Sequence, residues 1–258
     1  MSGEARKLKA YPHKPKAALL AEALDHARDD YQAGQTKAAA AAAEGRATFF
    51  KIQGGRALEV AALEYGFGGA IAEVRGWLSA SCAAAHTAIK LGQPLDPGLH
   101  RWYLAQAVLC RDKTFRGQLE GLSRAQFTDA TVRGDEIYYL AAEAMRDIAR
   151  GDLDQAAEAC GDGVARIEAG APKPHEIAAM EAILRLEAAI AAKDPDRLAA
   201  AIAARTQRQQ AYFQKGTNRN FRAGLLDIEG LGLLKLAREQ GLSVAVDSVY
   251  LPLELLEA

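Results

Sequence analysis

Two nine-residue stretches decide the fold: ARGDLDQAA at residues 149–157 and AKDPDRLAA at residues 192–200. Each stretch ends one segment of helical apolar spacing, turns within a few residues, and resumes with a run containing alanines. The two stretches begin 43 residues apart, the difference between positions 149 and 192. Helices joined by such short turns run antiparallel to each other, so the pattern predicts two helical hairpins over residues 135–214.

The capping residues agree with this arrangement. Asp152 and Asp194 each stand where a helix should begin, and we expect their carboxylates to accept a first-turn N–H. Pro195 then occupies the first helical position, where its missing N–H costs nothing. The G-D-x-x-x-A turn resembles the tetratricopeptide repeat, although the interval here exceeds the roughly 34 residues of that repeat. We therefore expect an all-α fold of stacked antiparallel hairpins, loosely similar to tetratricopeptide repeats.

Apolar spacing predicts further helices on both sides of these hairpins. We expect a single helical domain over residues 1–258, with a flexible lead-in at 1–15 and a terminal helix plus a short extended tail at 223–258. In the first half, Gly34 is expected to end one helix and Thr36 to cap the next, while Gly54-Gly55 and Gly66 are expected to end two more. The remaining expected elements are helices at 70–91, 97–110 and 115–122 and a loop at 127–134.

Composition supports helices and limits the possible functions. Alanine, the best intrinsic helix former, accounts for 56 of the 258 residues. The formal net charge is −1, which argues against a general nucleic-acid binder. No stretch approaches the roughly 18 consecutive apolar residues of a membrane span. The first residues lack the apolar core of a secretion signal. Cys82, Cys110 and Cys160 lack C-x-x-C spacing, so we expect reduced thiols and a cytoplasmic protein.

No catalytic, cofactor-binding or metal site is predicted. Asp29-Asp30 is similar to a D-D-x-x-D metal motif, but Ala33 replaces the third carboxylate. The glycines at 66, 68 and 69 lack the strand and the Lys-Ser or Lys-Thr pair of a phosphate loop. Ser79 and Ser81 lack a nucleophile elbow. None of the histidines has a partner at metal-ligand spacing; they are His13, His26, His86, His100 and His175.

The end of the chain carries the most specific pattern, LGLLKLAREQGLSVAVDSVYLPLELL at residues 231–256. A helix ends at Gly241, an extended V-x-V piece follows, and D-S-x-Y-L-P leads into a final Leu-Leu. We expect Tyr250 and Leu251 to dock onto the helices and Pro252 to start the last turn. With the residues before it, this ending resembles the bacterial Immunity protein 49 family. The resemblance lies in Phe221, Leu225, Leu231, Leu234, Ala237, Gly241, Val244, Val246, Asp247, Ser248, Tyr250, Leu251, Pro252 and Leu256.

The resemblance implies a helical protein that binds a cognate effector toxin and neutralises it without turnover. It would block the toxin's active site or hold the toxin in an inactive shape. No cofactor is implied, and a homodimer is possible through an apolar patch on the last two helices. Two other hypotheses stay open. A helical-repeat scaffold or adaptor would present a concave groove lined with polar side chains to a peptide or protein, and an enzyme would show a deep pocket with converging ionisable groups.

The segment at residues 217–222 is the candidate partner-binding site. Its polar residues Asn218, Arg219, Asn220 and Arg222 surround Phe221, and arginines and aromatic residues often anchor protein interfaces. The alternative interpretation is an ordinary loop in which Phe221 anchors the core. Acidic residues could also contact a basic toxin, and we expect Asp29 and Asp30 to bind the partner. The remaining members of this acidic set are Asp25, Glu136 and Glu143.

Overall fold

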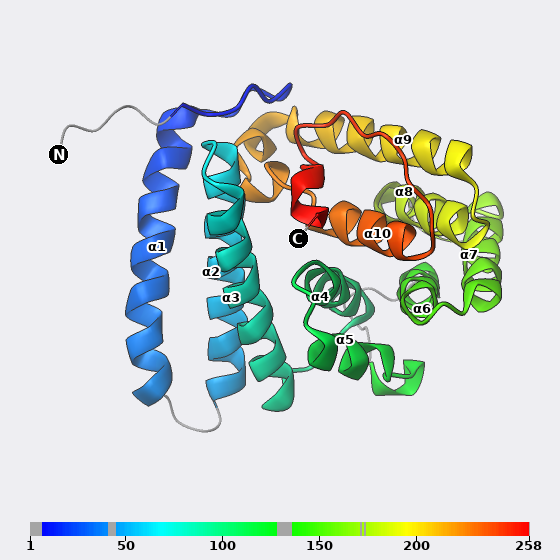
Figure 1. The fold of residues 1–258 in the computed structure, drawn as a ribbon, viewed down its shortest axis with the longest axis horizontal. Helices are drawn as coiled ribbons and strands as arrows, with labels where there is room; N and C mark the ends of the chain where they lie inside the picture. Colours follow the sequence, from blue (N-terminus) through cyan, green and yellow to red (C-terminus); the bar gives the residue numbers. More distant parts are fainter. Residues whose placement is uncertain (1–6, 41–44, 128–135, 171, 173, 258) are drawn as a thin grey trace. The chain divides into compact units, whose positions relative to one another are not determined.

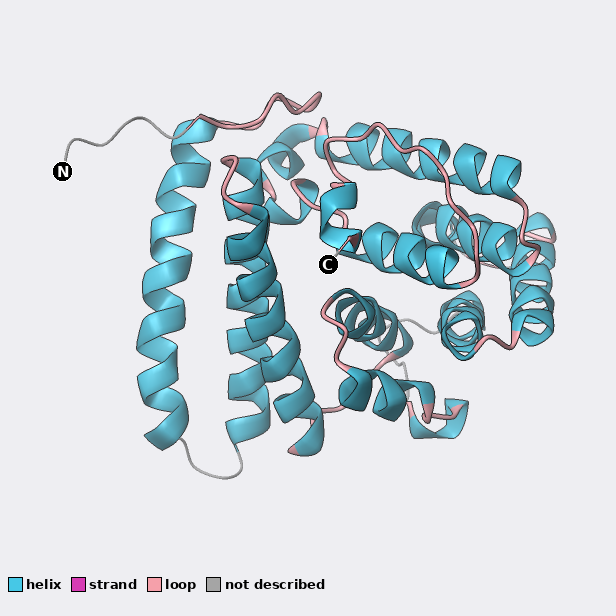
Figure 2. Ribbon diagram, viewed as in Figure 1, coloured by secondary structure: helices cyan, strands magenta, loops and turns pink. Residues whose placement is uncertain are grey.

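The chain forms helices wherever its apolar residues recur with helical spacing, as a computed structural model shows (Figures 1 and 2). The structure describes residues 7–40, 45–127, 136–170, 172 and 174–257. Throughout these residues it contains α-helices and short 3₁₀ helices but no β-strand. The prediction of an all-α fold is therefore confirmed.

The chain divides into two compact units, each assembled from segments that are distant in the sequence. The first unit draws on Met1–Gln93, Arg208–Asp227 and Ser248–Ala258, and the second on Pro94–Gln207 and Ile228–Asp247. The final segment thus belongs to the same unit as the first helices. Each unit is described separately below.

Three long helices form most of the first unit: α1 (Ala17–Ala40), α2 (Arg46–Gly66) and α3 (Ile71–Lys90). α2 packs against both α1 and α3 (Figure 1). Two 3₁₀ helices also contact these helices. η4 (Arg222–Gly224) packs on α2, and η5 (Leu253–Leu256) packs on α3.

The predicted helix ends at Gly34 and Gly54-Gly55 are wrong, because α1 and α2 continue through them. Thr36 therefore lies inside α1 and does not cap a helix. A Cβ atom on Gly34 would lie 1.8 Å from the Gln53 side chain, and one on Gly54 would lie 3.2 Å from the Ser81 carbonyl oxygen. The Ser81 hydroxyl also donates to the Gly54 carbonyl at 2.8 Å. Close contact between helices, and not chain reversal, explains these two glycines.

The glycine-rich turn after α2 agrees with its prediction. α2 ends at Gly66, and Gly68 has a φ of +74°, a conformation that residues with a Cβ rarely adopt. The backbone N–H of Gly69 donates to the Glu64 carbonyl at 2.8 Å. The segment is therefore a tight connection between α2 and α3.

Both predicted hairpin turns connect helices. The second unit draws on α4 (Pro97–Leu109), α5 (Lys113–Glu120), α6 (Glu136–Arg150), α7 (Leu153–Glu168), α8 (Pro174–Ala191), α9 (Pro195–Phe213), whose last residues belong to the first unit, and α10 (Ile228–Glu239). α6 packs against α7 and α8, α7 packs against α8, and α10 packs against α4. Gly232 of α10 touches α4 so closely that a Cβ would lie 2.6 Å from the Cβ of Ala105. Of the predicted loop at 127–134, residues 128–134 lie outside the described part of the chain.

One of the two predicted caps of the hairpins forms. Asp194 Oδ1 accepts a hydrogen bond from the Arg197 backbone N–H at 2.9 Å, and Pro195 begins α9 as expected. Asp152 precedes α7, but its side chain accepts no bond from that helix, so this prediction is wrong. Its ψ of 64° lies outside the extended region that points an N-cap side chain at the first turn.

The C-terminal tail docks within the first unit, as the sequence predicts. Tyr250 is 1% exposed and Leu251 is also buried. The Asp227 N–H donates to the Tyr250 carbonyl at 2.9 Å, and the Tyr65 hydroxyl donates to the Val249 carbonyl at 2.7 Å. Pro252 then precedes η5. These backbone bonds fix the path of the tail without a β-strand.

The residues before α1 are also held in place. The Lys9 N–H donates to the Gly66 carbonyl at 2.8 Å, and the Tyr11 hydroxyl donates to the Leu225 carbonyl at 2.9 Å. Tyr11 and His13 are both buried. Residues 7–16 therefore form a strap with one turn, closed by the Lys14 N–H donating to the Tyr11 carbonyl at 3.0 Å, and its aromatic side chains belong to the core of the first unit.

Candidate partner-binding surface

The polar segment at residues 217–222 forms the 3₁₀ helix η3 (Gly216–Asn220) and the start of η4 in the first unit. The Lys16 N–H donates to Asn220 Oδ1 at 2.9 Å, and Asn218 Nδ2 donates to the Tyr212 carbonyl at 3.5 Å. Arg219 is exposed, and its side chain makes no hydrogen bond or ion pair to any described residue. The asparagines therefore fix the backbone, whereas Arg219 is available to a partner.

Phe221 lies on the surface with 55% of its area exposed, so its interpretation as a core anchor is wrong. Phe213 takes the buried position instead. Its ring packs against Gly224, where an added Cβ would lie 2.8 Å from the nearest Phe213 ring atom. The Phe213 and His13 ring centroids are 5.9 Å apart. Tyr212, the neighbour of Phe213, is 56% exposed. Two large aromatic side chains are thus exposed to solvent, Phe221 within the polar segment and Tyr212 shortly before it in the sequence.

A chain of ion pairs connects two of the predicted site residues. Asp30 of α1 lies 3.1 Å from Arg56 of α2, and Arg56 lies 3.2 Å from Glu59. Glu59 in turn pairs with Arg222 of η4. Desolvation and the nearby Arg56 charge lower the pKa of Arg222. The structure therefore brings Asp30 and Arg222 onto one connected polar surface, although the two residues are far apart in the sequence.

The other predicted acidic residues are distributed over both units. Asp29 is exposed on α1, beside Asp30, and Asp25 is exposed one turn earlier. Glu136 belongs to the second unit and pairs with Arg124. Glu143 also lies there, and burial raises its pKa. The three aspartates therefore lie on one helix of the first unit, whereas both glutamates belong to the second unit.

Buried aromatic rings support the polar segment from below. His13 Nδ1 lies 3.0 Å from the Tyr250 hydroxyl, and the Tyr11 and Tyr250 ring centroids are 5.7 Å apart. Burial lowers the pKa of His13, and the positive charge of Arg219 lowers it further. His13 is therefore neutral at physiological pH and acts as a packed core residue. The buried His13 ring also packs against Phe213, the neighbour of the exposed Tyr212.

We call this region the 212–222 surface, defined by Tyr212, Asn218, Arg219, Asn220, Phe221 and Arg222. It combines exposed aromatic area, a guanidinium that pairs with no described residue, and asparagine amides held by hydrogen bonds, which is the chemistry of protein-interface anchors. Among the residues that the structure describes, no group of three or more His, Cys, Asp or Glu side chains could hold a metal ion. The exposure of Phe221 and Tyr212 was not apparent from the sequence pattern.

Large pKa shifts also occur in the interior of the second unit. Arg101 lies 2.9 Å from Glu229 and 3.5 Å from Glu187, and Arg205 lies 3.1 Å from Glu229. Glu187 is fully buried, and desolvation raises its pKa to about 8. Burial also raises the pKa of the nearby Cys160 thiol. Because Arg101 and Glu187 are both buried, this group of ionisable side chains acts on the stability of the fold.

Comparison with family models gives a match over residues 23–255 to the family described as Immunity protein 49. The chain belongs to the Immunity protein 49 family. A search of curated proteins and a search of solved structures each returned no match. No helix within the described residues is long and apolar enough to cross a membrane.

The Immunity protein 49 match confirms the resemblance that the tail suggests and extends it over both units. It includes Asp29, Asp30 and the whole 212–222 surface, and it ends inside η5. It begins after Tyr11 and His13, so the buried strap lies before the matched region. The family assignment supports a role in toxin immunity in general.

Proposed function

We propose that this Immunity protein 49 family member binds a cognate bacterial toxin and neutralises it by stoichiometric inhibition. The observation that carries the proposal is the exposure of Phe221 two residues from the exposed Arg219. Large exposed apolar side chains frequently mark interaction sites, and aromatic and Arg residues dominate interface hot spots. The 212–222 surface is thus the proposed contact with the toxin.

Inhibition of this kind requires binding without turnover. The protein would cover the toxin's active site or stabilise an inactive shape of the toxin, so it needs no reactive group of its own. Cys82, Cys110 and Cys160 form no disulfide bond with any described residue, which suits action in the reducing cytoplasm of the cell that is protected.

Charge would orient the two proteins during association. Arg219 offers a positive charge that no described residue neutralises. The exposed Asp29 offers negative charge on α1, and so does Asp30, although Asp30 also pairs with Arg56. A toxin surface with an acidic group opposite Arg219 and basic groups opposite α1 would complement both. Such complementarity chiefly raises the association rate and excludes wrong partners.

The test begins with the toxin-domain gene that we expect beside the gene for this protein. Cells that express the toxin should stop growing, and co-expression of this protein should restore growth. The purified proteins should also form a complex of fixed stoichiometry in calorimetry. Persistent growth arrest together with the absence of a complex would refute the proposal.

Point variants then test the proposed contact. Phe221→Ser and Arg219→Glu should each weaken toxin binding about tenfold or more, since each removes an interface anchor. Leu91→Ser and Lys51→Glu provide matched controls, because both residues are exposed in the same unit and lie outside the 212–222 surface. Equal losses in test and control variants would show that the contact lies elsewhere.

A further inference from the structure

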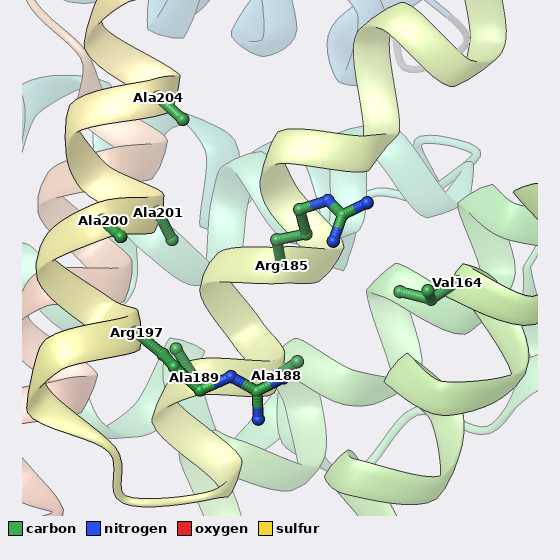
Figure 3. Close-up of a pocket in the computed structure, with 8 residues that line it drawn as sticks. All are labelled: Val164, Arg185, Ala188, Ala189, Arg197, Ala200, Ala201 and Ala204. Atoms are coloured by element: carbon green, nitrogen blue, oxygen red, sulfur yellow. The ribbon is translucent and has the colours of Figure 1, made fainter.

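A groove with a volume of about 380 Å³ opens between helices of the second unit (Figure 3). Most of its lining residues belong to α8 and α9, where they recur at helical spacing. One face of each of these two helices therefore forms the groove. Most of the lining side chains are small, so neither helix fills the space between them. The lining residues are Val164, Arg185, Ala188, Ala189, Arg197, Ala200, Ala201 and Ala204.

The polar side chains that line the groove are two arginines. Arg185 projects from α8 toward Val164, and Arg197 reaches from α9 toward Ala188 and Ala189 (Figure 3). Arg185 donates to Glu181 on its own helix at 3.0 Å. Arg197 is exposed, and no carboxylate of a described residue pairs with it. The groove therefore combines an apolar floor with positive charge that is incompletely neutralised.

The floor favours a helical occupant over an extended peptide. The backbone groups of α8 and α9 already bond within their helices, and alanine methyl groups offer no hydrogen bond. An extended peptide would bury N–H and C=O groups without partners, whereas a helix satisfies its own. Small side chains also let a third helix approach closely. This lining differs from the polar groove expected of a peptide-binding repeat scaffold.

We infer that this groove receives an α-helical segment of the toxin. The segment would place small apolar side chains against Ala200 and Ala204 and a carboxylate opposite Arg197. The positive charge of the two arginines favours an acidic residue on the toxin helix. The apolar floor favours binding through the helix face that carries the small apolar side chains. This inference rests on the proposed function, but it concerns a separate surface from residues 212–222.

The experiment measures binding of the purified product of the adjacent toxin gene. Ala204→Trp fills the groove and should weaken binding more than about tenfold, as expected for an obstructed anchor site. Ala203→Trp is the matched control, since Ala203 is an exposed neighbour on α9 that does not line the groove. Arg197→Glu should also weaken binding and reduce its salt dependence, whereas Lys113→Glu, at an exposed position outside the groove, should not. Arg197→Glu keeps the test valid if the Trp variant fails to fold.

A diazirine amino acid at position 200 identifies the occupant directly. It should crosslink to one toxin segment that is helical and carries Asp or Glu next to apolar residues, and position 203 should not crosslink. Unchanged toxin binding by both groove variants would overturn the inference and leave the immunity proposal intact. If the groove variants change only self-association in light scattering, the occupant is a second copy and the inference is wrong. If the toxin binds no form of the protein, both proposals fail.

Discussion

The Nδ1 atom of His13 lies 3.0 Å from the hydroxyl oxygen of Tyr250, a residue 237 positions away in the chain. This contact joins the strap before α1 to the C-terminal tail within the first unit. The His13 ring also contacts Phe213, which directly follows Tyr212 of the 212–222 surface. The contact therefore couples both ends of the chain to the proposed toxin-binding residues.

Tyr250→Phe should lower the free energy of unfolding by about 1 kcal/mol, because the substitution leaves a buried His13 nitrogen without its partner. Urea denaturation would measure the loss. Tyr212→Phe is the control, since Tyr212 is largely exposed and its hydroxyl can bond to water. Similar effects of the two substitutions would argue against a stabilising role for the His13–Tyr250 contact.

The raised pKa of Glu187 should make the free energy of unfolding depend on pH. Its pKa rises from an ordinary value of 4.5 to about 8 in the folded protein, because burial outweighs the attraction of Arg101. Between these two values the unfolded chain loses the proton while the folded protein retains it. Stability contributed by this group therefore falls as pH rises through that window, by up to about 1.4 kcal/mol per pH unit.

Glu187→Gln should remove this dependence, since the amide does not titrate. The free energy of unfolding of the variant, measured from pH 5 to pH 8, should exceed that of the natural protein increasingly as pH rises, at roughly the slope given by one proton. Glu158→Gln changes an exposed carboxylate on α7 and should leave the profile unchanged. Parallel profiles for Glu187→Gln and the natural protein would contradict the assignment.

The sequence predicts most helices because apolar periodicity and alanine content act locally. It fails at Gly34 and Gly54, where the reason for glycine is a contact with another helix. A sequence pattern shows that a Cβ is absent but not which neighbour requires its absence. For the same reason the groove beside Ala200 and Ala204 was not anticipated, since exposed alanines and tightly packed alanines look alike in the sequence.

A helical glycine with open space around it and a helical glycine in contact with another helix should respond oppositely to substitution by alanine. Gly55→Ala in α2 should stabilise the protein by about 0.5–1 kcal/mol, because nothing lies within 4 Å of the added Cβ. Gly232→Ala should destabilise it, since its Cβ would lie 2.7 Å from the Ala105 Cα atom. Thermal unfolding of both variants would check the signs. Stabilisation by Gly232→Ala would mean that α10 and α4 can separate at little cost.

The residue types of the 217–222 segment predict that it lies at an interface, but they do not predict which of its neighbouring aromatic residues are exposed. Asn, Arg and Phe in one segment indicate an interface, and the segment does lie at the surface. The pattern could not decide between Phe213 and Phe221 as the core residue. That choice depends on the space beside Gly224 and on the position of His13, both of which arise from tertiary packing.

The two arginines of the 212–222 surface should separate binding from stability. Arg219 has no internal partner among the described residues, so Arg219→Ala should weaken toxin binding without changing the free energy of unfolding. Arg222 pairs with Glu59, and a partly exposed ion pair contributes about 0.2–1 kcal/mol. Arg222→Ala should therefore reduce both quantities.

A double-mutant cycle with Glu59→Ala measures the Arg222–Glu59 pair. Arg222→Ala should cost less stability in the Glu59→Ala background than in the natural protein, by the coupling energy of the pair. The same comparison for Arg219→Ala should give no coupling to Glu59. If Arg219→Ala lowers stability as much as Arg222→Ala and leaves toxin affinity intact, then Arg219 supports the fold, and the aromatic residues Tyr212 and Phe221 become the sole candidates for the anchors of this surface.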